Sequence, residues 1–278
     1  MSEAFAAARP GMDYIAERTG GEIVRDSLRI YREYFGPLLV IYALPVLPVL
    51  ALSAYGNFTA DPVALLVVGI LDLLVAVFPY GAVTIAVADI CLGNRPTLGS
   101  SYGAIARNFW RYVGTYALYM AIAIGAILVG VGAGGFLVGM GHPVAGFGLG
   151  AVALALALVW LFRYMFCCQI CILERRGPLQ SLRRSRQLLR GSFWRVVGLS
   201  VAMFCLVWLV LIAVMVVWSA ALATFPEVNI VFFNDVFARL LTIAATPALL
   251  IAFVLIYYDL RVRKENYDSD ALTLELMS

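Results

Sequence analysis

Two hexapeptides indicate how this chain is built: FWRYVG at residues 109–114 and FWRVVG at residues 193–198, 84 residues later. Each copy begins eight residues after a serine, and the same spacing occurs once more near the start of the chain (Ser27 to Phe35, Ser101 to Phe109, Ser185 to Phe193). Each of the three copies leads into a long apolar stretch. We therefore expect a threefold array of one membrane-entering unit.

The composition is that of an integral membrane protein. Hydrophobic residues make up 63% of the chain and charged residues 13%, with a mean hydropathy of +0.92, whereas soluble domains have about 25% charged residues. Six apolar runs are long enough, or nearly so, to cross a bilayer as helices: residues 36–55, 63–90, 112–138, 147–172, 196–220 and 238–259. The runs are continuously apolar rather than alternating, which favours helices over a β-barrel.

The predicted fold is all-α and polytopic: six transmembrane helices form three repeated hairpins, each preceded by an amphipathic interfacial helix. We expect one integral membrane domain over the whole chain. Its predicted parts are a cytoplasmic N-terminal segment (1–21), three hairpin units (22–95, 96–176, 177–263) and a cytoplasmic tail (264–278).

The basic residues predict the orientation. Of nineteen arginines and one lysine, only Arg239 flanks an outer loop and only Arg163 lies inside a predicted span. The other eighteen share the side of the termini, which the positive-inside rule makes cytoplasmic. The opposite loops carry Asp61, His142, Glu227 and Asp235. We expect a multi-pass protein of the bacterial cytoplasmic (inner) membrane with both termini in the cytoplasm, and no cleavable signal peptide.

Short amphipathic helices should lie along the inner leaflet before each hairpin. In the first, Val24, Leu28, Tyr31 and Phe35 form an apolar stripe opposite several arginines. The candidate lipid-phosphate contacts in the three helices are Arg25, Arg29, Arg32, Arg107, Arg111, Arg183 and Arg195. They are interpreted as interfacial anchors, with specific anionic-lipid binding as the alternative.

Ten glycines fall between Gly125 and Gly150, across the end of the third span and the start of the fourth, and they form three pairs at i, i+4 spacing: Gly130 with Gly134, Gly135 with Gly139, and Gly146 with Gly150. Such pairs allow helix backbones to approach closely. The third and fourth helices are thus the predicted tightest pair, or they present a face for self-association.

Two short motifs, one typical of dinucleotide binding and one of a catalytic serine, occur in the sequence, and we reject both. Gly130, Gly132 and Gly135 fit a dinucleotide-binding motif but lie in an apolar span without a preceding strand. Ser101 fits a nucleophile motif, but His142 is the only histidine and is predicted on the opposite side of the membrane. We expect no catalytic residue, no cofactor and no metal.

Two charges inside predicted spans are the best functional leads, because ionisable groups there are costly and are usually paired or functional. They are Asp72 and Arg163, which helical geometry places about 9 Å apart in depth. A structural ion pair or a snorkelled anchor is one interpretation. A substrate or proton pathway is the other.

Two stretches resemble a bacterial family: LERRGPLQSLRRSRQLLRGSFWRVVG at residues 173–198 and YYDLRVRKE at residues 257–265. The chain is similar to the six-helix membrane domain fused to some glycerophosphoryl diester phosphodiesterases, and to related stand-alone proteins of largely unknown function. The resemblance implies an inner-membrane protein connected with lipid or envelope handling. In fused members a separate soluble domain performs the hydrolysis, and only about twenty residues follow the last predicted span here, so that activity is not expected.

Acids and arginines at the cytoplasmic ends of the hairpins form a candidate interface network: Asp89, Glu174, Arg186, Arg190, Asp259 and Arg261. Our hypothesis is that Glu174 and Asp259 pair with arginines of the interfacial helices, each pair contributing about 1 kcal/mol where it is exposed.

The sequence therefore favours a non-enzymatic membrane module that interacts with lipids or binds a partner. The alternative is a transporter or channel for a small solute or a lipid. The expected partners are anionic lipid headgroups at the cytoplasmic face and an unidentified protein, with no nucleic acid.

Overall fold

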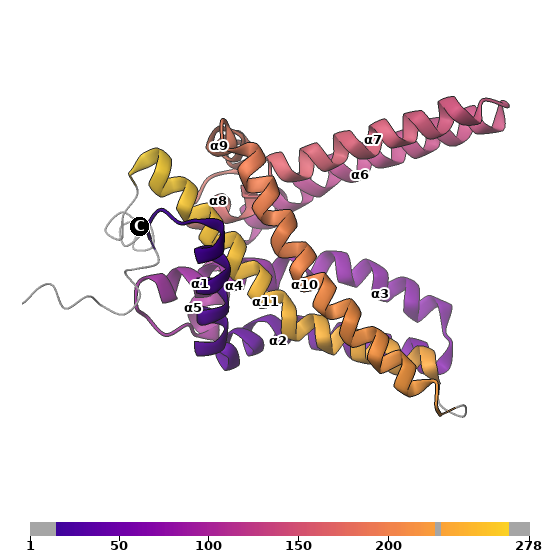
Figure 1. Ribbon diagram of the computed structural model, residues 1–278, viewed down its shortest axis with the longest axis horizontal. Helices are drawn as coiled ribbons and strands as arrows, with labels where there is room; N and C mark the ends of the chain where they lie inside the picture. Colours follow the sequence, from indigo (N-terminus) through magenta and orange to yellow (C-terminus); the bar gives the residue numbers. More distant parts are fainter. Residues whose placement is uncertain (1–14, 226–228, 267–278) are drawn as a thin grey trace, which may run out of the picture. The chain divides into compact units, whose positions relative to one another are not determined.

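The computed structural model describes residues 15–225 and 229–266, and these residues form helices and short connections without a strand. The predicted N-terminal segment and C-terminal tail lie largely outside the described residues, as does Glu227. The helices, shown in Figure 1, are α1 (Gly20–Glu33), α2 (Phe35–Thr59), α3 (Pro62–Val75), α4 (Val77–Cys91), α5 (Leu98–Arg107), α6 (Phe109–Gly139), α7 (Pro143–Arg163), α8 (Cys167–Leu173), α9 (Pro178–Leu189), α10 (Phe193–Leu222) and α11 (Ile230–Glu265).

Six helices among the described residues are long and apolar enough to cross a membrane, which confirms the all-α polytopic fold. Two of the spans are interrupted. The second consists of α3 and α4, which meet at Ala76, and the fourth consists of α7 and α8, which are separated by a turn at residues 164–166. The sixth helix is longer than its predicted apolar run because Asn229 caps it, its side chain accepting a hydrogen bond from the Phe232 N–H at 3.1 Å.

The repeated serine and phenylalanine occupy equivalent places in the fold. The phenylalanine is the first residue of α2, α6 and α10, each of which is a membrane span. The serine lies in the short helix before each span and is buried in all three copies (Ser27, Ser101, Ser185). A small side chain at this position lets the short helix pack closely against its neighbours.

The described chain separates into two compact units rather than three. One comprises the described residues up to Arg107 together with those from Gly198 onward, and the other comprises Asn108–Val197. Because α10 belongs mostly to the first unit and its first turn to the second, the proposed grouping into three hairpins stays a prediction.

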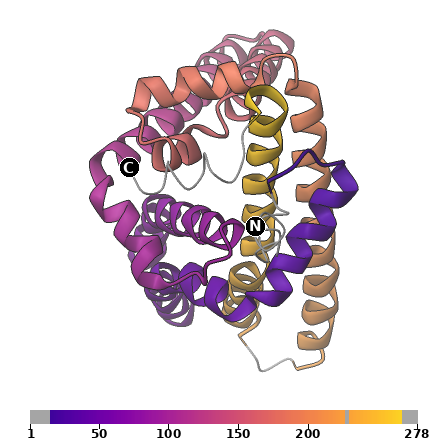
Figure 2. The same ribbon diagram turned by 90° about the vertical axis from the view of Figure 1, so that its left-hand side faces the viewer.

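In the first unit α11 is the central helix. It packs against α1, α2 and α4, and Figure 2 shows α1 beside it. The C-terminal half of α11 is buried almost continuously from Leu249 to Arg261, and α4 is buried from Gly81 to Ala88. Apolar side chains from these two helices therefore supply much of the core of this unit.

In the second unit α6 and α7 form a long hairpin, with α8 and α9 packed against α6. A Cβ atom on Gly134 would stand 2.6 Å from the Gly146 carbonyl oxygen, so the two backbones are in contact there. A Cβ atom on Gly130 would likewise clash with the Ala153 side chain. The prediction of a tight pair is supported at these positions, whereas Gly135 and Gly139 have open space where a Cβ would be.

Candidate functional site: a basic groove and an intramembrane ion triad

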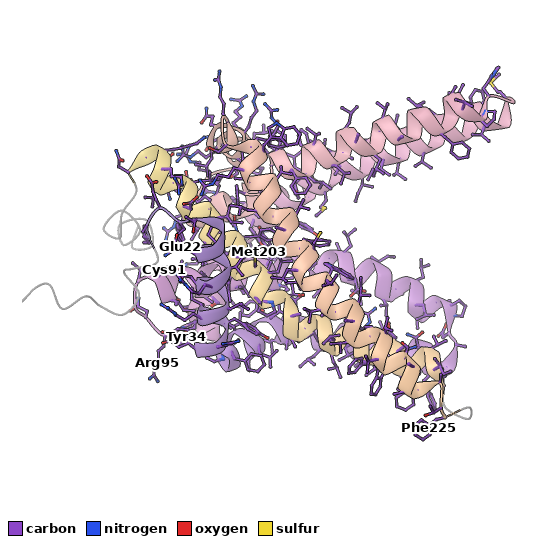
Figure 3. The ribbon with its side chains drawn as sticks, viewed as in Figure 1. Glu22, Tyr34, Cys91, Arg95, Met203 and Phe225 are labelled. Atoms are coloured by element: carbon purple, nitrogen blue, oxygen red, sulfur yellow. The ribbon has the colours of Figure 1, made fainter. Side chains whose placement is uncertain are left out.

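Helix α1 is anchored at its start by a capping box. The Thr19 hydroxyl accepts a hydrogen bond from the Glu22 N–H at 3.4 Å, and the Glu22 carboxylate accepts one from the Thr19 N–H at 2.7 Å. The hydrogen bonds from Thr19 lower the pKa of the Glu22 carboxyl group below its usual value. Figure 3 labels Glu22 at this end of the helix.

The packed face of α1 differs from the predicted apolar stripe. The buried residues are Ile23, Ser27 and Ile30, which hold the helix against its neighbours. Leu28, which we predicted to lie on the apolar face away from the arginines, is instead 42% exposed and lies among them. The hydrophobic pattern identified the helix but placed its buried face one residue away.

A groove runs along the exposed face of α1. It has a volume of about 540 Å³ and is lined by Arg25, Leu28, Arg29, Arg32 and Glu33. Its three arginines are exposed, and the described part of the chain offers none of them a hydrogen bond or an ion pair. With Glu33 as the one acid in its lining, the groove carries a net positive charge, and the α2 span begins just after it at Phe35.

The other predicted lipid contacts lie around the starts of α6 and α10. Arg107, Arg111 and Arg183 are exposed and Arg195 is partly so. Beside them, Trp110 is 83% exposed and Trp194 is 80% exposed. Tryptophan is enriched at the membrane–water interface, so these two indole rings suit the headgroup depth.

A second polar site lies inside the spans of the first unit. Arg239 of α11 donates hydrogen bonds to both carboxylate oxygens of Asp72 on α3, from Nη1 and Nη2, each at 3.1 Å. Its Nε lies 3.3 Å from each carboxylate oxygen of Asp235, one turn earlier on α11. The buried Ser53 hydroxyl of α2 donates to Asp235 at 2.6 Å. We call Asp72, Arg239 and Asp235 the ion triad.

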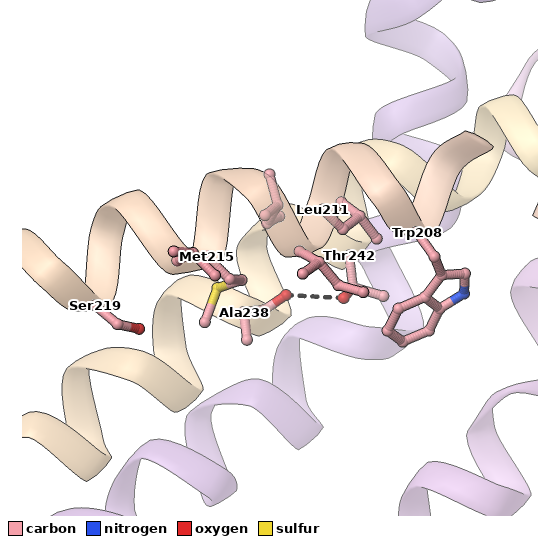
Figure 4. A pocket seen from close by; sticks show the side chains of 9 residues that line it. Trp208, Leu211, Met215, Ser219, Ala238 and Thr242 are labelled. Atoms are coloured by element: carbon pink, nitrogen blue, oxygen red, sulfur yellow. Dashed lines mark hydrogen bonds between the residues drawn. The ribbon is translucent and has the colours of Figure 1, made fainter. Parts of the chain in front are cut away.

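The ion triad borders a cavity of about 370 Å³ between α2, α3 and α11. Tyr42 and Val49 from α2 complete its wall. An apolar groove of about 420 Å³ between α10 and α11 adjoins it, because Ala238 and Thr242 line both spaces. Figure 4 shows this groove, with the Thr242 hydroxyl donating to the Ala238 carbonyl oxygen at 2.8 Å.

Asp72, one of the two predicted intramembrane charges, thus pairs with Arg239. Arg163 is exposed at the last residue of α7, where its carbonyl oxygen accepts a hydrogen bond from Ser185 at 3.3 Å. Sequence reasoning missed Arg239 and Asp235 as site residues because it placed both at the outer loop. Their i, i+4 spacing behind a capping asparagine was the available signal for a helix that begins earlier.

In the predicted interface network, Glu174 behaves as the hypothesis requires. It is almost buried and pairs with Arg184 of α9 at 3.1 Å and with Arg176 at 2.8 Å. Arg184 was not among the predicted residues. The predicted Arg186 and Arg190 are exposed, and the described residues offer Arg186 no ion pair.

Asp259 is bound from two segments, α11 itself and the residues before α1. Its carboxylate accepts a hydrogen bond from Arg263, one turn later on α11, at 2.9 Å, and another from the Arg18 N–H at 2.7 Å. Arg18 immediately precedes the cap of α1, so the segment that leads into the interfacial helix contributes a backbone donor to Asp259. Arg261 is buried and pairs with Glu265 at 3.2 Å. Asp89 accepts a hydrogen bond from Ser100 at 2.8 Å.

The comparisons found no match among the curated proteins and none among the solved structures. A family match extends over residues 21–262, from the first turn of α1 almost to the end of α11. It thus includes both the basic groove and the ion triad. The chain belongs to the family described as "Domain of unknown function (DUF7847)".

Proposed function

We propose that this membrane protein is a non-enzymatic module of the bacterial cytoplasmic membrane that binds anionic lipid headgroups in the groove on α1. The observation that carries the proposal is the set of three exposed arginines, Arg25, Arg29 and Arg32, that line one groove with a single acid, Glu33, so that the groove carries a net positive charge. The resemblance to lipid-handling membrane domains agrees with this role and remains a prediction.

The chemistry of the groove suits a phosphate group. A guanidinium presents paired N–H donors that match two phosphate oxygens, and Leu28 offers an apolar surface beside them. The arginines are spaced i, i+4 and i+7, so all three lie on one face of the helix. A lipid phosphate held there would relieve their mutual repulsion, with its acyl chains directed toward the span.

The orientation is part of the proposal. With the termini in the cytoplasm, α1 lies at the inner leaflet, whose anionic lipids attract basic segments by about 1 kcal/mol per residue. The groove would then sit at headgroup depth. A protein partner at the same face is compatible with this arrangement.

The test is native mass spectrometry of the full chain released from nanodiscs that contain equal amounts of phosphatidylglycerol and phosphatidylcholine. Wild-type protein should retain phosphatidylglycerol preferentially. In R25Q/R29Q/R32Q the loss of three charges, about 3 kcal/mol in total, should weaken that retention roughly a hundredfold.

The matched control is R25K/R29K/R32K, which keeps the charge and removes the paired donors. It should retain more phosphatidylglycerol than the glutamine variant and less than the wild type. Equal retention of the two lipids by the wild type, or unchanged retention in the glutamine variant, would contradict the proposal.

A transporter of a small solute is the second candidate function. It is favoured by a separate observation, the cavity beside Asp72, Asp235 and Arg239 within the spans. Transport pathways commonly carry paired ionisable groups in membrane helices.

A further inference from the structure

We propose that the ion triad is a binding site for one exchangeable monovalent cation, with Asp235 as the acid that receives it. The site is independent of the lipid groove on α1. A proton and a sodium ion are the two sources of the single positive charge, and the experiment below distinguishes them.

The ion triad contains more negative than positive charge. Two carboxylates share one guanidinium, so the ion triad carries a net charge of −1 when both acids are ionised. Counted along the helices, Asp72 lies ten residues after the start of α3 and Arg239 nine after the start of α11, about 14–15 Å from those ends. Both residues therefore lie within candidate membrane spans. An uncompensated charge at that depth is costly, which favours uptake of one positive charge.

The carboxylates of the ion triad are accessible from a cavity. The cavity of about 370 Å³ reaches Asp72, Asp235 and Arg239 together, so a small ion can approach the carboxylate oxygens without unpacking the helices. The other polar side chains on its wall are the Tyr42 hydroxyl and the Thr242 hydroxyl, and Thr242 donates to its own helix. Arg239 is thus the only cation lining this cavity among the described residues.

The hydrogen bonds identify the receiving acid. Asp72 takes two bonds from Arg239 at 3.1 Å, one to each oxygen, in the paired geometry that is strongest for arginine. Asp235 shares the single Nε–H between its two oxygens at 3.3 Å, so its link to Arg239 is weaker. When Asp235 is neutralised, Arg239 can keep its whole fork on Asp72.

Ser53 makes Asp235 suitable for either cation. Its hydroxyl lies 2.6 Å from Asp235 and can donate to a carboxylate or accept from a carboxylic acid. For a proton, a hydronium ion in the cavity transfers its proton to an Asp235 oxygen, an O–H bond forms and water remains. For sodium, the Asp235 and Ser53 oxygens supply ligands of the type that hard cations prefer.

The experiment follows carboxyl protonation by infrared difference spectroscopy, with the full chain in nanodiscs and sodium-free buffer. Wild-type protein should show a carboxylic acid band that titrates, and D235N should lose it. In the sodium arm, the thermal midpoint should rise in sodium chloride relative to choline chloride, again only when Asp235 is present.

The matched control is D61N. Asp61 caps α3 outside the ion triad, accepting from the Val63 N–H at 2.9 Å, and asparagine caps helices equally well. D61N should therefore behave as the wild type in both arms. D235N should fold, because it leaves one carboxylate for one guanidinium.

A second variant covers the case in which D235N is not recovered as folded protein. D235E keeps the charge and should shift the acid band or change the response to sodium. The proposal is overturned if neither cation has an effect on the wild type, or if D235N or D235E responds as the wild type does. D235N should keep its phosphatidylglycerol, so the two proposals fail separately.

Discussion

The Tyr102 hydroxyl replaces a backbone hydrogen bond that Pro45 removes from α2. Pro45 has no N–H, so the Ile41 carbonyl oxygen lacks the donor that helix geometry would give it. The Tyr102 hydroxyl of α5 donates to that oxygen at 2.6 Å. A neighbouring helix thus supplies the missing hydrogen bond, as a proline in a membrane helix requires.

We predict that Y102F destabilises the first unit by about 1–3 kcal/mol, because the Ile41 carbonyl is left without a donor. In a P45A background the same change should cost less, since an alanine in place of Pro45 restores a backbone N–H that can donate to the Ile41 carbonyl. Chemical denaturation in detergent measures both effects as a double-mutant cycle. Y55F is the control, because Tyr55 is an exposed tyrosine on α2, the helix that carries Pro45. Additive effects of Y102F and P45A would refute this explanation.

The Tyr102 phenol also predicts that the folded protein loses stability at alkaline pH. Burial raises the pKa of the Tyr102 phenol to about 12, and the unfolded value is about 10. The folded state therefore holds this proton more tightly. The resulting stability is fully present below about pH 10 and is lost as the pH rises through about 12. Wild-type protein should lose stability over this range more steeply than Y102F, as measured by the denaturation midpoint against pH.

At the scale of the element, the α6–α7 hairpin depends on which glycine faces its partner. A methyl group at Gly134 would lie 2.6 Å from the Gly146 carbonyl oxygen, which is backbone and has little freedom to move. A methyl group at Gly135, the next residue, would meet open space. Adjacent positions on one helix should thus respond in opposite ways.

We predict that G134A destabilises the hairpin by about 1–3 kcal/mol through overpacking. G135A should be neutral or stabilising by up to about 1 kcal/mol, because alanine is the better helix former. Unfolding of the two variants in the same detergent measures the difference. A cost for G135A as large as that for G134A would mean that the outer glycine face also contacts a helix, for example in a second copy of the chain.

At the scale of the whole molecule, the distribution of arginine predicts how the chain crosses the membrane. His142 is exposed between α6 and α7, and Gly21 is exposed at the start of α1 with open space around it. Most basic residues lie on the side of Gly21 along the predicted topology. The two positions should therefore face opposite sides.

A membrane-impermeant thiol reagent should label H142C in intact spheroplasts and G21C only in opened membranes. Cys91, Cys167, Cys168 and Cys171 are buried, and Cys205 lies in the α10 span, so the unmodified chain serves as the background. Labelling of both positions from one side would exclude the proposed topology. Reversed labelling would place the lipid groove at the outer leaflet.

The sequence by itself determined the six spans and the helix in front of each repeated phenylalanine. These features depend on local quantities: the length of an apolar run, a capping residue and the spacing of arginines along one helix. The arginines that line the α1 groove were recognised for the same reason, since i, i+4 and i+7 positions share a face whatever else the chain does.

Only the tertiary structure decided which charges and which backbones meet. Asp72 is separated from Arg239 by 167 residues, and their pairing depends on how α3 and α11 pack against α2, which no local pattern encodes. The choice of Gly134 over Gly135, and of Tyr102 as the donor to Ile41, likewise depends on the rotation of one helix against another. Such rotations are set by many weak packing contacts together, so a pattern within a single helix cannot specify them.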